Sequence, residues 1–279
     1  MKYIIYSLIP FLIYINIFVA FGAFSLYKVT EIIFTFHNPT IGAFIFFSTL
    51  FAYNYMRIIH TLSIKKIFFS STYTYLDIIY IILFISGLIS GYLLFSLGWS
   101  FVLLVLPAVI ISLLYPISFQ INNKSYGLRS IPFLKIFLIG LVWAYMTVCV
   151  PLLYESFNLD YLFLDYVFQR FLFVIAISIP FDIRDVSIDT ISTLPNQIGI
   201  YNSKLFAWFC LFVIDLLLVV DLINHHISAP LFFALFLSIE IASIIIYYTN
   251  SNRSNLFYGL IVEGLSIIMC LFVMLFTFF

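Results

Sequence analysis

The chain has 279 residues, of which 65% are apolar and 9% are charged, and its 12 basic and 12 acidic side chains give a formal net charge of zero. A soluble domain carries about 25% charged residues, which it needs in order to face water, so this composition excludes a soluble globular protein. The zero net charge gives no indication of a nucleic-acid partner. The sequence is therefore that of an integral membrane protein.

Apolar segments long enough to cross a hydrocarbon layer of about 30 Å recur along the chain. They predict an all-α membrane bundle of roughly nine transmembrane helices that forms a single domain. The first segment is too long for the apolar part of a signal peptide, so we expect it to be retained. The predicted helices cover residues 3–27, 38–59, 76–97, 99–116, 132–154, 161–181, 204–224, 229–248 and 256–279.

Lysines and arginines concentrate in every second loop, beginning with the segment before the first helix. Because translocation of positive charge is disfavoured, these segments predict a cytoplasmic N-terminus and a C-terminus outside. We expect the protein in the plasma (inner) membrane, with its functional site on the cytoplasmic side. The basic residues concerned are Lys2, Arg57, Lys65, Lys66, Lys124, Arg129, Arg184 and Arg253.

Three aspartates follow one another closely at the cytoplasmic end of the sixth predicted helix. Asp182, Asp185 and Asp189 have the spacing i, i+3 and i+7, so on a helix their carboxylates project from one face. Mg²⁺ relieves the repulsion between such carboxylates, and it binds oxygen ligands together with phosphate oxygens of a substrate. We therefore predict a magnesium site that activates a diphosphate leaving group. The alternative is that the aspartates are simply solvated in a loop.

The segment of residues 180–189, followed by Leu194-Pro195 and by residues 199–204, resembles the second aspartate-rich motif of UbiA-type prenyltransferases. The resemblance implies an intramembrane bundle of nine helices in which Mg²⁺ bridges two aspartate-rich motifs to a prenyl diphosphate. It also implies that the prenyl group is transferred to an aromatic or other membrane-associated acceptor. On this basis Asp182, Asp185 and Asp189 are expected to bind the metal and the diphosphate.

The first motif of that family, N-D-x-x-D-x-x-x-D, is degenerate in this sequence. Asn54 is present, but Tyr55, Ile58 and Leu62 stand at the positions of the three aspartates. None of these three side chains can coordinate Mg²⁺ as a carboxylate would. Either the chain binds its substrate with one acidic cluster and basic side chains, or it has lost transferase activity.

Basic residues near the same predicted face offer direct phosphate contacts. The guanidinium of Arg57 can bind a diphosphate through charge-assisted hydrogen bonds. Asn54 is expected to give polar support at a helix end. In the resembling family an acidic residue often lines the cavity from the ninth helix, which favours Glu263 here. The residues predicted to bind substrate are Asn54, Arg57, Arg129, Lys135, Lys204 and Glu263.

Two further functions remain open from the sequence. A non-catalytic UbiA-like protein that binds an isoprenoid would explain the missing aspartates of the first motif. A transporter would use Asp215, Glu240 and Glu263, which lie inside predicted helices, as an ion path. The transporter hypothesis is the weaker of the two, because the acidic cluster lies at the cytoplasmic face and transport sites generally lie near the midplane.

Overall fold

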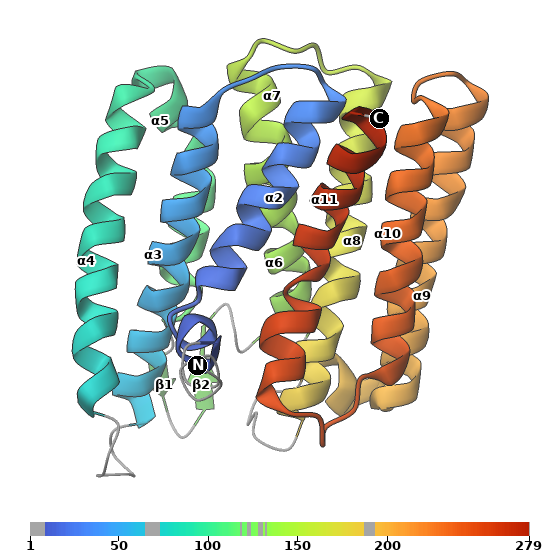
Figure 1. Ribbon diagram of the computed structural model, residues 1–279. Helices are drawn as coiled ribbons and strands as arrows, with labels where there is room; N and C mark the ends of the chain where they lie inside the picture. Colours follow the sequence, from blue (N-terminus) through green and yellow to red (C-terminus); the bar gives the residue numbers. More distant parts are fainter. Residues whose placement is uncertain are drawn as a thin grey trace, which may run out of the picture.

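The structure, a computed structural model, is a bundle of helices that stand side by side (Figure 1). It describes residues 9–64, 73–117, 119–121, 124–127, 131, 133–186 and 193–278. The predicted site residues Arg129 and Asp189 lie outside the described residues. A short antiparallel hairpin of β1 (Phe119–Ile121) and β2 (Lys124–Tyr126) lies between the helices of residues 99–114 and 134–144.

The helices follow one another along the chain with short connections. They are α2 (Ile17–Ile33), α3 (Pro39–Ile64), α4 (Tyr73–Ser96), α5 (Trp99–Leu114), α6 (Leu134–Ala144), α7 (Val150–Tyr154), α8 (Tyr161–Asp185), α9 (Leu194–Ile223), α10 (Ala229–Tyr248) and α11 (Leu265–Phe278). The chain also has two π-helical segments. The segment η2 (Tyr145–Cys149) joins α6 to α7, and η3 (Phe257–Val262) precedes α11.

The chain is an all-α integral membrane protein, as the sequence predicts. Within the described residues, 6 helical runs are long and apolar enough to cross a membrane. They are Asp77–Ser96, Leu134–Tyr154, Tyr161–Asp185, Leu194–Ile223, Ala229–Tyr248 and Phe257–Thr277. Each of the predicted ranges falls on helical residues, but a total of nine crossings stays a prediction because the other helices do not meet this criterion.

Most helix ends differ from the prediction by a few residues, and the first and seventh predicted helices differ most. The first is broken at Asn16, whose left-handed φ of 61° separates helical residues 9–14 from α2, and α2 then continues to Ile33. Asparagine adopts this conformation more readily than most residues. The seventh begins at Leu194 instead of Lys204, and a φ of 84° at Gly199 kinks it. The length of an apolar segment does not reveal a break inside it. It also does not fix where a helix begins, because a helix can continue through polar residues.

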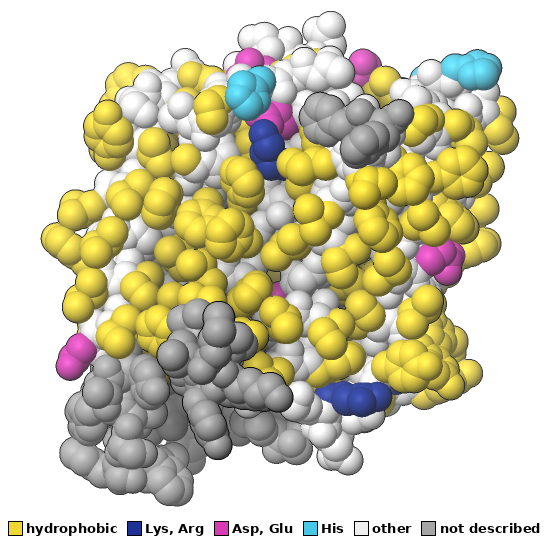
Figure 2. Space-filling view, viewed as in Figure 1, with side chains coloured by type: hydrophobic (Ala, Val, Ile, Leu, Met, Phe, Trp, Pro, Cys, Tyr) yellow, Lys and Arg dark blue, Asp and Glu magenta, His cyan; other side chains and the backbone are white. Residues whose placement is uncertain are grey.

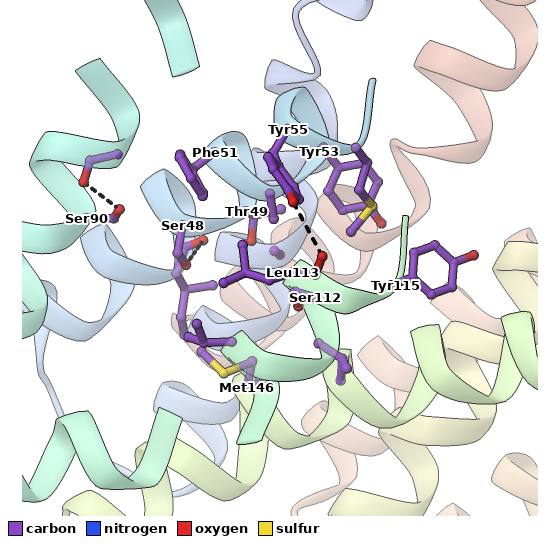
Figure 3. A pocket seen from close by; sticks show the side chains of 18 of the residues that line it. Ser48, Thr49, Phe51, Tyr53, Tyr55, Ser90, Ser112, Leu113, Tyr115 and Met146 are labelled. Atoms are coloured by element: carbon purple, nitrogen blue, oxygen red, sulfur yellow. Dashed lines mark hydrogen bonds between the residues drawn. The ribbon is translucent and has the colours of Figure 1, made fainter. Parts of the chain in front are cut away.

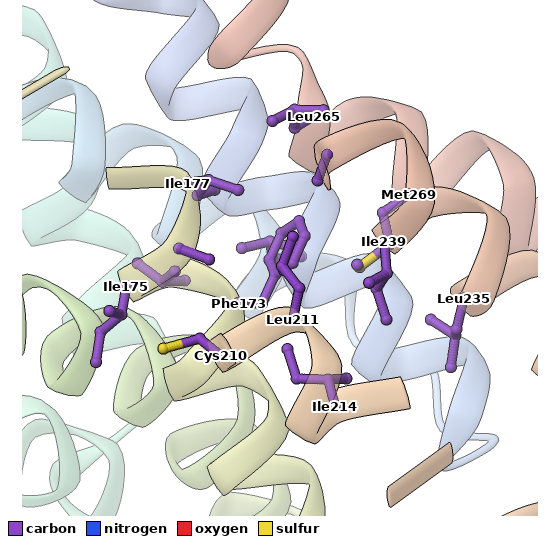
Figure 4. Packing of buried hydrophobic residues seen from close by; sticks show 14 of the residues in the cluster. Phe173, Ile175, Ile177, Cys210, Leu211, Ile214, Leu235, Ile239, Leu265 and Met269 are labelled. Atoms are coloured by element: carbon purple, nitrogen blue, oxygen red, sulfur yellow. The ribbon is translucent and has the colours of Figure 1, made fainter. Parts of the chain in front are cut away.

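The core lies around α8, which packs against α6 and α9. Figure 4 shows Phe173 and Ile177 of α8 pointing toward side chains of α9, α10 and α11. Because lipid chains are as apolar as these side chains, close packing drives the association of the helices. Hydrophobic side chains also cover the outer surface (Figure 2), where they face lipid.

A polar network fastens α2, α3 and α7 at the upper end of the bundle in Figure 1. Glu31 is buried and accepts a hydrogen bond from the backbone N–H of Asn38 at 2.8 Å. Lys28 forms an ion pair with Glu31, and the Asn38 amide donates to Glu155 at 2.8 Å. These contacts satisfy charges that would otherwise be costly near lipid.

Residues 9–14 lie at the lower end of the bundle, and α11 ends at the upper end (Figure 1). We expect Asn224 and Ser251, which are exposed in loops at opposite ends, to face opposite sides of the membrane. In a chain whose natural cysteines are replaced by serine, an impermeant maleimide should label Ser251→Cys from the cytoplasm and Asn224→Cys from outside. Labelling of both from one side would contradict the topology.

Candidate functional site

Charged side chains from four parts of the chain gather near the lower end of α8. We call them the charged cluster: Arg57, Lys135, Asp182, Arg184, Asp185 and Glu263. Except for Arg184, all of them were predicted as site residues from the sequence. The cluster joins α3, α6, α8 and the residue that follows η3.

An ion pair between Lys135 of α6 and Asp182 of α8 forms one half of the charged cluster. The Lys135 Nζ lies 2.6 Å from Asp182 Oδ1, and the two side chains are 18% and 3% exposed. Gly140 allows α6 to approach α8 closely, because a Cβ at this position would meet Ile175 at 3.0 Å. A short, largely buried contact of this kind is a charge-assisted hydrogen bond.

Arg184 organises the other half of the charged cluster. Its Nε and Nη2 donate to the two carboxylate oxygens of Asp185 at 2.7 and 2.9 Å, which is a bidentate pair. The guanidinium carbon lies 5.4 Å from the ring centre of Phe181 and 5.5 Å from that of Tyr258, within cation–π range. Arg57 and Arg184 are both close enough to Glu263 for their charges to act on its carboxylate.

Arg57 and Asn54 fasten α3 to the break that precedes α2. Arg57 donates to the carbonyl of Tyr14 and, at 2.8 Å, to Asn16 Oδ1. Asn54 is fully buried, donates to the carbonyl of Ile15 at 3.0 Å and accepts from the Asn16 amide at 3.2 Å. Asn54 therefore lies at the junction between α3 and this break, and its role as polar support for a substrate site stays a prediction.

A mainly apolar cavity of about 970 Å³ adjoins the charged cluster, and Lys135 is among its lining residues. Its walls come from α3, α4, α5, α6 and η2. In Figure 3, Tyr53, Tyr55, Ser112 and Met146 surround this space. The volume is in the range of sites for small molecules and cofactors, and the scarcity of polar walls suits an apolar ligand.

The π-helical segments η2 and η3 both border the site. Met146 and Thr147 of η2 line the cavity, and the Thr147 hydroxyl donates to the carbonyl of Trp143 at 2.7 Å. Tyr258 of η3 contacts Arg184 and donates to the carbonyl of Asn250 at 2.6 Å. Single turns of π-helix are frequent at functional sites because they re-aim side chains within a helix.

The degenerate first motif has its own structure. The Tyr55 hydroxyl donates to the carbonyl of Leu113 in α5 at 3.5 Å (Figure 3), and Tyr55 also lines the cavity. Ile58 is buried, and the side chain of Leu62 lies outside the described residues. In place of two of the expected metal ligands, α3 therefore supplies a cavity wall and a packing residue.

The structure does not bring Lys204 to the charged cluster. Its ammonium donates to the carbonyl of Tyr247 at the end of α10, at 2.8 Å. Sequence reasoning did not select Arg184 or Tyr258 for the site. The available signal for Arg184 was its place between Asp182 and Asp185, whereas Tyr258 depends on a π-turn that the apolar pattern does not indicate.

The described side chains, as they lie, do not fit a bound Mg²⁺. No group of three or more His, Cys, Asp or Glu side chains within the described residues is arranged to hold a metal. Asp182 is paired with Lys135, and Asp185 is paired with Arg184. A metal would have to displace both cations from these carboxylates.

Solved structures provide the comparison that defines the fold. The apo structure of a UbiA homologue from Aeropyrum pernix K1 has a TM-score of 0.67 and 14% identity, with 92% of this chain and 98% of that chain covered. A UbiA homologue from Archaeoglobus fulgidus bound to GPP and Mg²⁺ has a TM-score of 0.63 and 11% identity, covering 96% and 100%. This chain has the UbiA fold.

A third similar structure is that of digeranylgeranylglyceryl phosphate synthase. It has a TM-score of 0.56 and 14% identity to this chain, and the match covers 95% of each chain. No protein-family model matches the sequence, and the search of curated proteins finds no match. The fold of UbiA-type intramembrane prenyltransferases, predicted from residues 180–189, is therefore confirmed by the structure and not by sequence similarity.

Asn54→Ala should destabilise the UbiA fold by about 2 kcal/mol. The substitution leaves the side-chain amide of Asn16 and the carbonyl of Ile15 without their hydrogen bonds to Asn54. The free energy of unfolding can be measured by titration with SDS in mixed micelles. Asn202→Ala is the matched control, since Asn202 is exposed and bonds only within its own helix. Equal stability of the two variants would contradict a structural role for Asn54.

Proposed function

We propose that the chain binds a prenyl diphosphate and transfers its prenyl group to an aromatic or lipid-soluble acceptor within the membrane. The observation that carries this proposal is the position of Lys135, which lines the apolar cavity and pairs with Asp182. A prenyl diphosphate matches a cationic group at the wall of an apolar cavity, because it joins an anionic head to a long apolar tail. The UbiA fold supports the reaction class.

In this proposal Lys135 contacts the diphosphate at the cavity wall, and the prenyl chain occupies the cavity. An ammonium group has three donor hydrogens, so Lys135 can bind a phosphate oxygen while it stays near Asp182. Arg57 and Arg184 raise the local positive charge, while Glu263 lies beside both guanidinium groups. Breaking the bond between carbon and oxygen leaves diphosphate as the departing anion, which cationic side chains stabilise.

The sequence predicts Asp182, Asp185 and Asp189 as ligands of Mg²⁺, but the ion pairs of Asp182 and Asp185 do not fit a bound metal, and we derive no step of the reaction from one. The contacts of Asp182 and Asp185 with Lys135 and Arg184 favour phosphate binding by side-chain cations. Localisation in the plasma membrane, with the charged cluster on the cytoplasmic side, belongs to the same proposal. It rests on the distribution of basic loops.

A non-catalytic isoprenoid-binding protein is the second candidate. It is favoured by Tyr55 and Ile58, which replace carboxylates of the first motif by a cavity wall and a buried side chain. Such a protein would keep the cavity and the anion contacts without promoting loss of diphosphate. Binding and turnover must therefore be measured separately.

Lys135→Ala should weaken binding of geranyl thiolodiphosphate, a poorly cleaved analogue, at least tenfold, because it removes a charge-assisted contact. Calorimetry on the purified chain in nanodiscs measures the affinity. Arg253→Ala is the matched control, since this exposed arginine contacts Phe257 and the carbonyl of Tyr248 and should bind within twofold of wild type. Equal weakening in both variants would indicate non-specific charge attraction.

Removal of Mg²⁺ with EDTA should change the affinity of wild type for this analogue by less than about threefold. The reason is that the Lys135 ammonium already supplies a positive charge for the phosphate, in a contact worth a few kcal/mol at most. In Lys135→Ala the carboxylate of Asp182 is released from its ammonium partner, so added Mg²⁺ should restore part of the binding. An absolute requirement for Mg²⁺ in wild type would instead support metal ligation by Asp182, Asp185 and Asp189.

Release of diphosphate from a panel of prenyl diphosphates, with a membrane lipid extract as the source of acceptor, separates the two functions. The proposed transferase should release diphosphate, and Asp182→Asn should reduce the rate at least tenfold while Asn202→Ala leaves it unchanged. Binding without release would favour the non-catalytic protein. Absence of both binding and release would refute the proposed function.

A further inference from the structure

Two carboxylates lie within the membrane-spanning part of α9 and α10, away from the charged cluster. Glu240 lies near the middle of α10 (Ala229–Tyr248), and its side chain is exposed. Leu237 and Ile244, one turn to either side of it, are 40% and 55% exposed. Figure 2 shows acidic atoms within the hydrophobic surface on the side of α10, so this face carries a charge where lipid is expected.

Asp215 of α9 is the neighbour of Glu240. The two helices are antiparallel and in contact, since Trp208 of α9 donates to the carbonyl of Ser243 in α10 at 3.1 Å. Asp215 and Glu240 are close enough for their charges to interact. The Oδ1 atom of Asp215 is buried and has no hydrogen-bond partner within the described residues. An exposed carboxylate on α10 and a partly buried one on α9 therefore lie near each other on this face.

Such a pair is unstable in hydrocarbon. An ionisable side chain in the middle of a membrane helix usually faces the interior of the bundle or pairs with another group, because exposure of a charge to lipid is costly. In this protein the interior faces of α9 and α10 are instead occupied by apolar residues such as Ile214 and Ile239, which are buried. A group outside the chain can reach the exposed carboxylate of Glu240.

The described side chains offer few exposed cations to a second copy of the chain. Among the lysines and arginines whose side chains are described, only Arg253 is exposed, and it lies in the loop between α10 and η3. Arg170, in the middle of α8, is buried and contacts Thr30 of α2 at 3.4 Å. Charge complementarity therefore favours a different membrane protein as the partner.

We propose that the outer face of α9 and α10 docks a transmembrane helix that carries a lysine or arginine near the middle of its span. The basic side chain forms an ion pair with Glu240 and Asp215. Phe212 and Leu216 of α9, which are 57% and 50% exposed, flank the position and give the partner helix an apolar surface for packing. This docking surface is independent of the proposed prenyltransferase function.

The test uses two synthetic transmembrane helices of leucine and alanine, about 20 residues long to match the bilayer. One has a lysine at its centre, and the other has leucine at the same position. Binding to the full chain in phosphatidylcholine vesicles is measured by energy transfer from a fluorophore on Ser251→Cys to an acceptor on the peptide. The lysine peptide should bind wild type at least tenfold more tightly than the leucine peptide.

Glu240→Gln should reduce this preference to less than threefold, and Glu240→Gln with Asp215→Asn should abolish it. Ile244→Gln is the matched control, because it adds an amide one turn away and keeps both carboxylates, so the tenfold preference should remain. Thermal unfolding of each variant shows that the chain is folded.

Three results would overturn the proposal. Equal binding of the two peptides to wild type would mean that lipid alone covers the carboxylates. A preference for lysine that survives in the double variant would place the contact elsewhere. Self-association of wild type that is lost in Glu240→Gln and that blocks the lysine peptide would identify a second copy of this chain as the occupant.

Discussion

The absence of water from the hydrocarbon layer is the constraint on which this structure depends. Backbone polar groups cannot be left unsatisfied there, so the chain forms helices that bond within themselves. Charged side chains must find partners inside the protein, and most of them do so near the two ends of the bundle. Glu31 and its partners fasten the upper end, while the Lys135–Asp182 pair links α6 to α8 near the lower end.

The functional site follows from the same constraint. The charged cluster contains two ion pairs, Lys135–Asp182 and Arg184–Asp185, and the neighbouring cavity is lined mainly by apolar side chains. A ligand that joins an anionic head to an apolar tail matches both environments without leaving the membrane. The chain has the UbiA fold, but here α3 contributes Tyr55 and Ile58 where the resembling family has carboxylates, and for this reason the proposed function assigns anion binding to side-chain cations.

The exposed Glu240 is the exception to this pattern of pairing. Its carboxylate lies on a surface that otherwise suits lipid, and Asp215 of the neighbouring helix is close enough for the two charges to interact. Exposure of a charge to lipid is costly, so this position is a candidate contact for another membrane-spanning group. The proposed docking of a basic transmembrane helix would give the two carboxylates a cation.

The membrane class, the all-α fold, the approximate helix ranges and the charged residues near the end of α8 could be predicted from the sequence, because they depend on local composition and on helical spacing. The pairing of Lys135 with Asp182, the presence of Arg184 in the site, and the contact of Lys204 with the carbonyl of Tyr247 could be found only from the folded chain. The contacts of Lys135 and Lys204 join residues far apart in the chain, and the contact of Arg184 with Tyr258 depends on a π-turn that apolar periodicity does not encode.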